Sequence, residues 1–219
     1  MKIIDCKQGS SEWFAARCGV VTASEVDALV TPKWKIKEGA AADTYLFKKV
    51  AEKLLGYSSD QLQGVSAFAM DQGKIVETIA RPWYAFTYDV NVETPGFCVS
   101  DCGRYGCSPD GLVGDDLGLE IKSPMPDNHV RYLINGKVPD DYLPQVHFSM
   151  LVTGRPEWEF VSYSRHLPAL VIRVQRDDAI QAVLRQAVDG FIARMDAALS
   201  KIETLRAIDR AEQRATKQP

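Results

Sequence analysis

The middle of the chain contains Cys107-Ser108-Pro109-Asp110-Gly111-Leu112, followed by Leu119-Glu120-Ile121-Lys122-Ser123-Pro124. Asp110 follows a proline in a turn between two expected strands. Glu120 and Lys122 lie two residues apart on the second strand, so their side chains point to the same face. A carboxylate or an ammonium group facing a core is costly unless it is paired or used. We therefore expect Asp110, Glu120 and Lys122 to form a site for a hard cation with a lysine beside it.

Hydrophobic periodicity and turn residues predict the surrounding elements. The expected helices are Ser10–Cys18, Thr22–Val30 with a capping box between Thr22 and Glu25, Ala40–Leu55, Val65–Tyr88 as one helix or a broken pair, Asp127–Ile134, Asp140–Val152 and Ile180–Leu205. The expected strands are Asn91–Ser100, Tyr105–Cys107, Leu112–Val113, Leu117–Lys122, Trp158–Ser164 and Ala169–Val174. This order predicts an α/β (α+β) fold with a central mixed β-sheet flanked by helices. We expect one domain over residues 1–205, which ends in a long helix, and a polar, frayed tail over residues 206–219.

Composition and charge exclude several classes of protein. The 219 residues are 46% hydrophobic and 25% charged, which is typical of a globular domain and not of a disordered chain or a disulfide scaffold. A net charge of −3 argues against a basic nucleic-acid coat protein. The acidity is concentrated in residues 61–150, with 6 basic and 12 acidic side chains, where a metal site or a solvated acidic face would account for it. No apolar run could span a bilayer, so we expect a cytoplasmic protein with reduced cysteines and no membrane partner.

The order of several motifs resembles a known family. Ser108-Pro109-Asp110-Gly111, followed after eight residues by Glu120-Ile121-Lys122, resembles the PD-(D/E)xK nuclease motif. The segments at residues 13–25, 73–77 and 142–147 are similar to the W-x3-R-x-G-x-[ILV]-T-A-S, G-x3-E and Y-x2-Q-[VL]-[QH] motifs of the phage-type alkaline exonucleases. They occur in the family's order, and together they resemble the lambda-exonuclease/YqaJ-type viral recombinase family.

That resemblance implies a restriction-endonuclease-like core and a Mg²⁺-dependent exonuclease. The enzyme would digest linear double-stranded DNA 5′→3′ from 5′-phosphorylated ends and leave 3′ single strands for recombination by strand annealing. It would use two Mg²⁺ ions, for which Mn²⁺ can substitute. The resemblance also implies a ring-shaped homotrimer around the duplex and a single-strand annealing recombinase as partner.

The resemblance assigns roles to individual residues of the site. Asp110 and Glu120 would bind Mg²⁺, with the backbone carbonyl of Ile121 completing one site. Glu77, from a separate helix, would hold the second ion; a solvent-facing helical carboxylate is the alternative. Lys122 would hold the attacking water and help to deprotonate it.

Two residues of the following helix complete the expected catalytic group. Gln145 would orient the water or a phosphate, unless it is a surface amide. Tyr142 lies one turn earlier on the same face and would contact DNA or pack in the core.

A second expected cluster suits a terminal 5′-phosphate. Arg17, Thr22, Ser24 and Ser108 supply a guanidinium group and small hydroxyl groups, which bind phosphate oxygens well. In the alternative interpretation, Thr22 only caps a helix and Arg17 forms a surface ion pair.

Further DNA contacts are expected from two regions. Lys33, Trp34 and Lys35 form a cationic loop with one aromatic, which could grip the backbone or stack on a base. Phe68 and Met70 could wedge between bases at the fork. In each region a side chain packed in the core is the alternative.

Two other functions remain open from the sequence. One is an endonuclease or repair nuclease of the same core that cuts without 5′-end dependence. The other is a non-catalytic DNA-end adaptor, which the presence of Asp110, Glu120 and Lys122 together disfavours.

Overall fold

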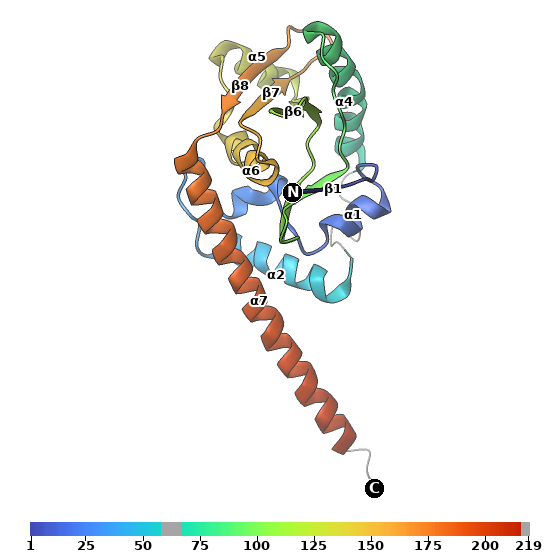
Figure 1. Ribbon diagram of the computed structural model, residues 1–219, viewed down its shortest axis with the longest axis vertical. Coiled ribbons are helices and arrows are strands. Elements are labelled where there is room, and N and C mark those ends of the chain that lie inside the picture. The colour runs from blue at the N-terminus through green and yellow to red at the C-terminus, as the bar shows by residue number, and fades with distance from the viewer. Residues whose placement is uncertain (58–66, 216–219) are drawn as a thin grey trace.

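A computed structural model describes residues 1–57 and 67–215; the side chains at 67–77, 211, 212, 214 and 215 lie outside that description (Figure 1). The elements, in chain order, are β1 (Lys2–Ile4), α1 (Ser11–Arg17), β2 (Val21–Thr22), the 3₁₀ helix η1 (Ala23–Ala28), α2 (Ala40–Leu55), α4 (Ala67–Tyr88), β3 (Phe97–Val99), β4 (Tyr105–Cys107), β5 (Gly111–Val113), β6 (Leu117–Lys122), α5 (Pro126–Asn135), the 3₁₀ helix η2 (Asp140–Tyr142), α6 (Leu143–Thr153), β7 (Glu157–Ser162), β8 (Leu170–Gln175) and α7 (Asp178–Ala215). The expected α/β class is confirmed.

The strands form two four-stranded sheets, where the sequence predicted one central sheet. The first has the order β1-β3-β4-β2 and the second the order β5-β6-β7-β8. Both are mixed, because β2 pairs with β4 and β6 pairs with β7 in parallel, whereas the other pairs are antiparallel. Pro109 separates β4 from β5; it has no N–H to continue a ladder, so one sheet ends there and the next begins.

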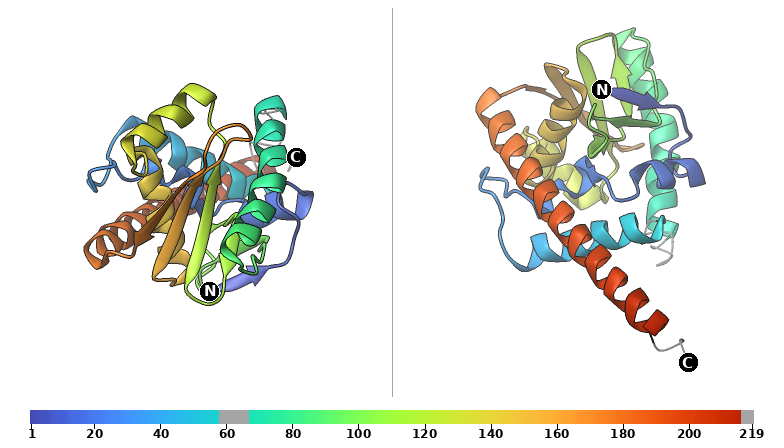
Figure 2. Two further views of the ribbon diagram at one scale, coloured as in Figure 1. Left: turned by 90° about the horizontal axis from the view of Figure 1, so that it is seen from above. Right: turned by 60° about the horizontal axis from the view of Figure 1, so that its bottom comes forward.

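Helices cover both faces of the second sheet (Figure 2, left). On one face, Ala80 and Tyr84 of α4 pack against Leu119 and Ile121 of β6. On the other face, α6 packs through a group of side chains that also includes Leu112 and Trp158. Because side chains alternate along a strand, Glu120 points to the α6 face, opposite Leu119 and Ile121. This alternation places the expected catalytic side chains beneath α5, η2 and α6.

Close packing between β6 and β7 depends on a glycine. Gly118 pairs with Trp158, and a Cβ atom at position 118 would lie 2.2 Å from Cζ3 of the fully buried Trp158 ring. The indole occupies the space that any other side chain at position 118 would need.

Gly118→Ala is therefore expected to lower the free energy of unfolding by about 2–3 kcal/mol, because overpacking forces the core to shift. Gly190→Ala is the matched control, since Gly190 lies within α7 and a Cβ atom there would meet no neighbouring side chain. Alanine in a helix is favoured over glycine by about 0.5–1 kcal/mol. Urea denaturation of both variants checks the opposite signs. Equal effects of the two substitutions would contradict this account of the packing.

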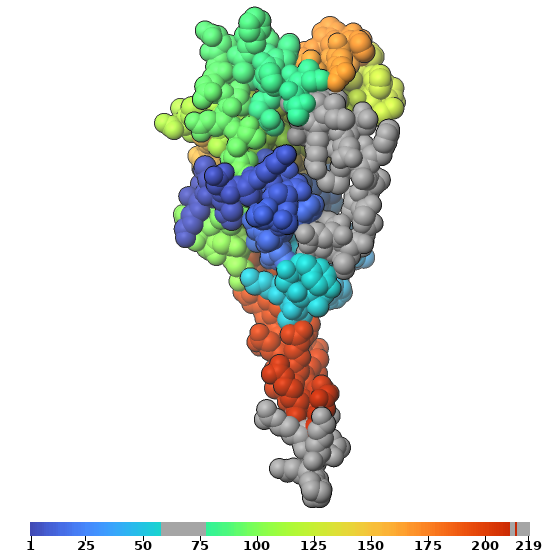
Figure 3. All heavy atoms as spheres, turned by 90° about the vertical axis from the view of Figure 1, so that its right-hand side faces the viewer, coloured from blue at the N-terminus to red at the C-terminus, as the bar shows by residue number. Residues whose placement is uncertain are grey.

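The C-terminal helix is longer than predicted. Its N-terminal half packs on α2 and α6 through the expected apolar stripe, in which Leu184, Val188, Phe191 and Met195 are buried. It continues to Ala215, ten residues beyond the predicted end at Leu205, and its C-terminal half extends away from the rest of the molecule (Figures 1 and 3). Alanine and arginine make up six of the ten residues 206–215, and both have high helix propensity.

Three other predictions differ from the structure. The expected helix Thr22–Val30 is a shorter 3₁₀ helix, Ala23–Ala28, and the expected strand Asn91–Ser100 is ordered as β3 only over Phe97–Val99. The three residues of β1 are all exposed, and they have no alternating pattern that would have predicted a strand. Of the region Val65–Tyr88, which was expected to form one helix or a broken pair, the described part is a single helix from Ala67 that continues through Pro82.

Among the described helices, none is both long and apolar enough to cross a membrane.

Candidate active site

The two carboxylates of the central motif lie together on adjacent strands. β5 and β6 pair with Gly111 opposite Leu119, so the same register continued by one residue places Asp110 opposite Glu120. Residues opposite each other in an antiparallel pair share a face. Oδ2 of Asp110 accepts a hydrogen bond from the amide of Ile121 at 2.6 Å, and both carboxylates are buried. The hairpin therefore brings together the residues predicted from the motif.

Glu120 lies between a lysine and a glutamine. Its Oε1 accepts hydrogen bonds from Nζ of Lys122 and from Nε2 of Gln145, each at 2.6 Å. Nζ of Lys122 lies 5.3 Å from the centre of the Tyr142 ring. Burial favours the neutral amine, but the carboxylates of Glu120 and Asp110 outweigh it and raise the pKa of Lys122 above its usual value. Gln145 and Tyr142 thus lie beside Glu120 and Lys122.

Helix α4 adds a residue that the motif did not predict. Nε of Arg81 donates to the backbone carbonyl of Asp110 at 2.6 Å. Glu77 precedes it by four residues in the same helix, so the two share a face, but the side chain of Glu77 lies outside the described residues. The spacing Glu77-x3-Arg81 was the signal that could have identified Arg81.

The donor atoms suit a hard divalent cation. Asp110 and Glu120 supply carboxylate oxygens, which Mg²⁺ prefers, on one face of the hairpin. The amide of Ile121 contacts Asp110, and the role expected for its carbonyl stays a prediction. Within the described side chains, no three His, Cys, Asp or Glu residues are grouped so that they could hold a metal ion. A cation at Asp110 and Glu120 would therefore need further ligands, from water, substrate, backbone or Glu77.

The expected phosphate cluster is assembled around Trp13. The indole Nε1 of Trp13 donates to Oγ of Ser108 at 2.8 Å, and the guanidinium carbon of Arg17 lies 4.1 Å from the centre of a Trp13 ring. Nη2 of Arg17 donates to Oγ of Ser24 at 3.2 Å. Trp13 and Arg17 are four residues apart in α1 and therefore share a face. Trp13, to which the sequence assigned no role, thus joins Ser108 to Arg17 and Ser24.

The direction of these hydrogen bonds favours binding of an anion. The oxygen of Ser108 accepts an N–H, so its hydroxyl proton remains to be donated. Oγ of Ser24 also accepts an N–H, from Arg17, but it lies 3.4 Å from Oγ1 of Thr22 and can donate to it. Thr22 differs, because it is fully buried and its hydroxyl donates to Oε2 of Glu25 at 3.0 Å. Its hydroxyl oxygen makes no side-chain cap to η1, and its amide donates to Oη of Tyr45 at 3.1 Å, so neither hydrogen bond of the expected capping box forms. This arrangement favours Thr22 as a support for Ser24, with an oxygen–oxygen distance of 3.4 Å, and not as a direct phosphate ligand.

Two lysines of α2 form ion pairs with Glu25, the residue that accepts the Thr22 hydroxyl. Its carboxylate pairs with Lys48 at 2.7 Å and with Lys49 at 3.1 Å, and Lys49 also pairs with the buried Glu52. Burial would raise the pKa of Glu25, but the two ammonium groups outweigh it and lower this pKa from 4.5 to about 2. The ionised carboxylate is therefore strongly favoured in the folded state.

The pKa of Glu25 predicts a specific loss of stability in acid. Since the pKa is lower in the folded protein, Glu25 stabilises the fold above about pH 4.5 and this contribution, about 3 kcal/mol, is lost as the pH falls towards 2. Glu25→Gln should therefore destabilise the protein strongly at pH 6 and much less at pH 3, as measured by urea denaturation. Asp27→Asn, an exposed change on the same 3₁₀ helix, is the control. A Glu25→Gln effect that is equal at both pH values would contradict the assignment.

Of the other residues expected to contact DNA, some are exposed and one packs in the core. Lys33 and Lys35 are exposed on a short loop closed by the bridge between Val30 and Ile36. The ring of Trp34 packs edge-on against buried His147, with centroids 5.1 Å apart, so it has the core role that was the alternative. The side chains of Phe68 and Met70 lie outside the described residues.

The site combines buried carboxylates, a lysine and donors suited to phosphate, which is typical of sites that cleave phosphodiesters. Residues 12–156 match the family model of the YqaJ-like viral recombinase domain, and the chain belongs to that family. The resemblance inferred from the motifs is confirmed.

Two solved structures extend this relationship over nearly the whole chain. Both are of LHK-Exo, an alkaline exonuclease from Laribacter hongkongensis, one of them in complex with dAMP. Each has a TM-score of 0.80 and 32% sequence identity, and the match covers 90% of this chain and 98% of that one. A phage-related exonuclease from Haemophilus somnus, at 12% identity and a TM-score of 0.56 over 92% of this chain and 97% of its own, shares the fold. No curated protein matches the sequence. The family and the LHK-Exo match support a nuclease of the phage exonuclease type.

Proposed function

We propose that the protein is an exonuclease that digests linear double-stranded DNA 5′→3′ from 5′-phosphorylated ends and leaves 3′ single strands. Membership of the YqaJ-like family and the match to an alkaline exonuclease support the activity. The observation that carries the polarity is the contact between Trp13 and Ser108, because it joins the anion-binding donors to a residue two positions before Asp110.

Repeated cleavage would present a 5′-phosphate to these anion-binding donors in every cycle. Water attacks the phosphorus between the first and second nucleotides, a new P–O bond forms, and the bond from phosphorus to O3′ breaks. The leaving O3′ takes up a proton, and the shortened strand carries a new 5′-phosphate. Each cycle thus regenerates the group that Arg17, Ser24 and Ser108 would bind.

Each side chain has a proposed part in this step. Asp110 and Glu120, with Glu77 from α4 and the carbonyl of Ile121, would hold Mg²⁺ or Mn²⁺. A divalent cation there would neutralise charge on the phosphate and increase the acidity of water. Lys122 and Gln145, both bonded to Oε1 of Glu120, would orient the attacking water, and the Lys122 ammonium would help its deprotonation by stabilising the hydroxide that forms. Arg81 would keep the Asp110 loop in place.

The proposal includes the oligomeric state of the enzyme and the protein that binds its single-stranded product. A ring-shaped homotrimer around the duplex would retain DNA despite the net charge of −3, because a closed ring does not depend on bulk attraction. A single-strand annealing recombinase would take up the 3′ strand. Both suggestions rest on family resemblance.

The test is a time course on linear duplex DNA that is phosphorylated at the 5′ end of one strand only and labelled at both ends. We expect Mg²⁺-dependent loss of mononucleotides from the phosphorylated strand and a much slower attack on the 5′-hydroxyl strand. Equal rates on both strands, or nicking of closed circular DNA, would favour an endonuclease or repair nuclease of the same core. Tight binding without digestion would favour a DNA-end adaptor.

A further inference from the structure

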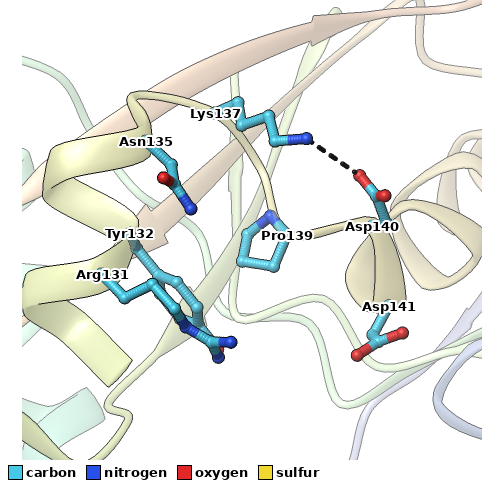
Figure 4. Close-up of a pocket in the computed structure, with 7 residues that line it drawn as sticks. All are labelled: Arg131, Tyr132, Asn135, Lys137, Pro139, Asp140 and Asp141. Carbon is cyan, nitrogen blue, oxygen red and sulfur yellow. Dashed lines mark ion pairs between the residues drawn. The ribbon is translucent and has the colours of Figure 1, made fainter. Parts of the chain in front are cut away.

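A pocket of about 290 Å³ lies between the end of α5 and η2, outside the catalytic residues (Figure 4). Its lining comes from the C-terminal turns of α5, the connecting segment and the start of η2. The lining residues are Arg131, Tyr132, Asn135, Lys137, Pro139, Asp140 and Asp141. None of them has a part in the proposed hydrolysis.

Contacts connect this pocket to the Lys122 end of the active site. Tyr132 lines the pocket and is close enough to Tyr142 to raise its pKa, second to burial. The Tyr142 ring in turn lies beside Nζ of Lys122, at 5.3 Å. Ser108 and its phosphate cluster adjoin the opposite, Asp110 end of the site. A strand with its 5′-phosphate near Ser108 and its scissile phosphate at the carboxylates would therefore continue towards the pocket.

Two of the pocket's cationic side chains contact neighbouring residues. Arg131 donates to Oδ1 of Asn128 at 2.7 Å, and its guanidinium carbon lies 5.5 Å from the centre of the Tyr132 ring. Lys137 and Asp140 form an ion pair at 3.6 Å across one side (Figure 4). Most of the lining side chains are exposed, so their polar groups are accessible to a ligand that enters the pocket.

The charges of the pocket favour a neutral ligand with both donors and acceptors. Arg131 and Lys137 would attract a phosphate, but Asp140 and Asp141 in the same lining would repel it. An uncharged heterocycle meets no such conflict: its ring nitrogens and carbonyl oxygens can accept from Arg131 and Asn135, and an amino group can donate to Asp141. The volume is at the low end for ligand pockets, which suits a single base and not a larger molecule. Guanidinium planes also stack on unpaired bases.

We propose that this pocket binds an unpaired nucleobase of the digested strand, on the 3′ side of the scissile phosphate. The inference rests on the proposed function, because it requires a DNA strand at the carboxylates. It assigns to Arg131 and Asp141 the recognition of the base, and it predicts that bases with an exocyclic amino group bind better than thymine.

The test compares digestion of a 5′-phosphorylated duplex with digestion of the same duplex carrying one abasic residue in the digested strand. We expect wild type to slow about tenfold at the abasic position, as the loss of one stacked base predicts. Arg131→Ala/Asp141→Ala should be about tenfold slower on intact DNA and show no additional pause. Arg165→Ala/Asp115→Ala, which removes the same charges from exposed positions elsewhere, should behave like wild type. A wild-type enzyme without the pause, or a pocket variant that pauses as strongly, would overturn the proposal.

Binding measurements separate this proposal from the proposed activity. With Asp110→Asn protein, a frayed 5′-phosphorylated duplex labelled with a fluorophore should bind about tenfold more tightly than its abasic counterpart. The pocket variant in the same background should bind the two equally. If wild type fails to digest DNA but this difference in affinity is found, the exonuclease proposal fails and the base pocket stands; if affinities are equal, the pocket proposal fails whatever the activity. Equal urea midpoints of variant and wild type establish that the fold is retained.

Discussion

Asp110→Asn should reduce the rate of digestion of 5′-phosphorylated duplex DNA by on the order of 10³-fold, because it removes one charge from the carboxylate pair that would hold the metal ion. Asparagine has the same shape, and its carbonyl oxygen can still accept the Ile121 amide hydrogen bond that orients Asp110 at 2.6 Å. The loss should therefore come from the chemistry and not from a displaced hairpin. Single-turnover digestion at saturating protein measures it, with DNA affinity determined separately.

Asp115→Asn is the matched control. Asp115 is exposed in the turn between β5 and β6, at the far end of the hairpin from Asp110, so the same loss of charge there should leave the rate unchanged. Raising the Mg²⁺ concentration should recover part of the Asp110→Asn activity if the defect is weaker metal binding. A variant within a few-fold of wild type at every Mg²⁺ concentration would exclude Asp110 as a metal ligand.

The residues of the central motif could be predicted because their geometry is local. Glu120 and Lys122 lie on one strand, and Asp110 is joined to them by a short hairpin, so the period of a strand is enough to place all three on one face. The same holds for Trp13 and Arg17, whose helical spacing was visible although the role of Trp13 was not.

Contacts between distant segments could not be predicted in this way. Arg81 meets Asp110 across 29 residues of sequence, and Trp13 meets Ser108 across 95. Each contact depends on how a helix packs against a hairpin, which hydrophobic periodicity does not determine. The division into two sheets has the same origin, because it depends on where a ladder ends at Pro109 and not on the propensity of any strand. The extension of α7 to Ala215 was missed for the opposite reason: apolar periodicity stops near Leu205, but helix propensity continues.

Arg17→Gln should abolish most of the discrimination between phosphorylated and hydroxyl ends. A charge-assisted hydrogen bond contributes about 1.5–3 kcal/mol, so loss of the guanidinium should slow digestion from 5′-phosphorylated ends by about 10- to 100-fold. The first cleavage at a 5′-hydroxyl end, which presents no terminal phosphate to Arg17, should hardly change. The ratio of the two initial rates on otherwise identical duplexes is the measurement.

Trp13→Phe tests whether the indole acts through Ser108. Phenylalanine keeps an aromatic ring for the Arg17 guanidinium, now 4.1 Å from the Trp13 ring, but removes the N–H that donates to Ser108 at 2.8 Å. The Ser108 hydroxyl would then lose the contact that fixes its orientation, and the preference for 5′-phosphate should fall by several-fold, less than in Arg17→Gln. Arg104→Gln breaks an ion pair with Asp196, which is not part of the cluster of Trp13, Arg17, Ser24 and Ser108. It should leave the ratio of the rates on phosphorylated and hydroxyl ends at its wild-type value. If Arg17→Gln slows both kinds of end equally, Arg17 contributes to stability or general DNA binding, and the 5′-phosphate must be recognised elsewhere.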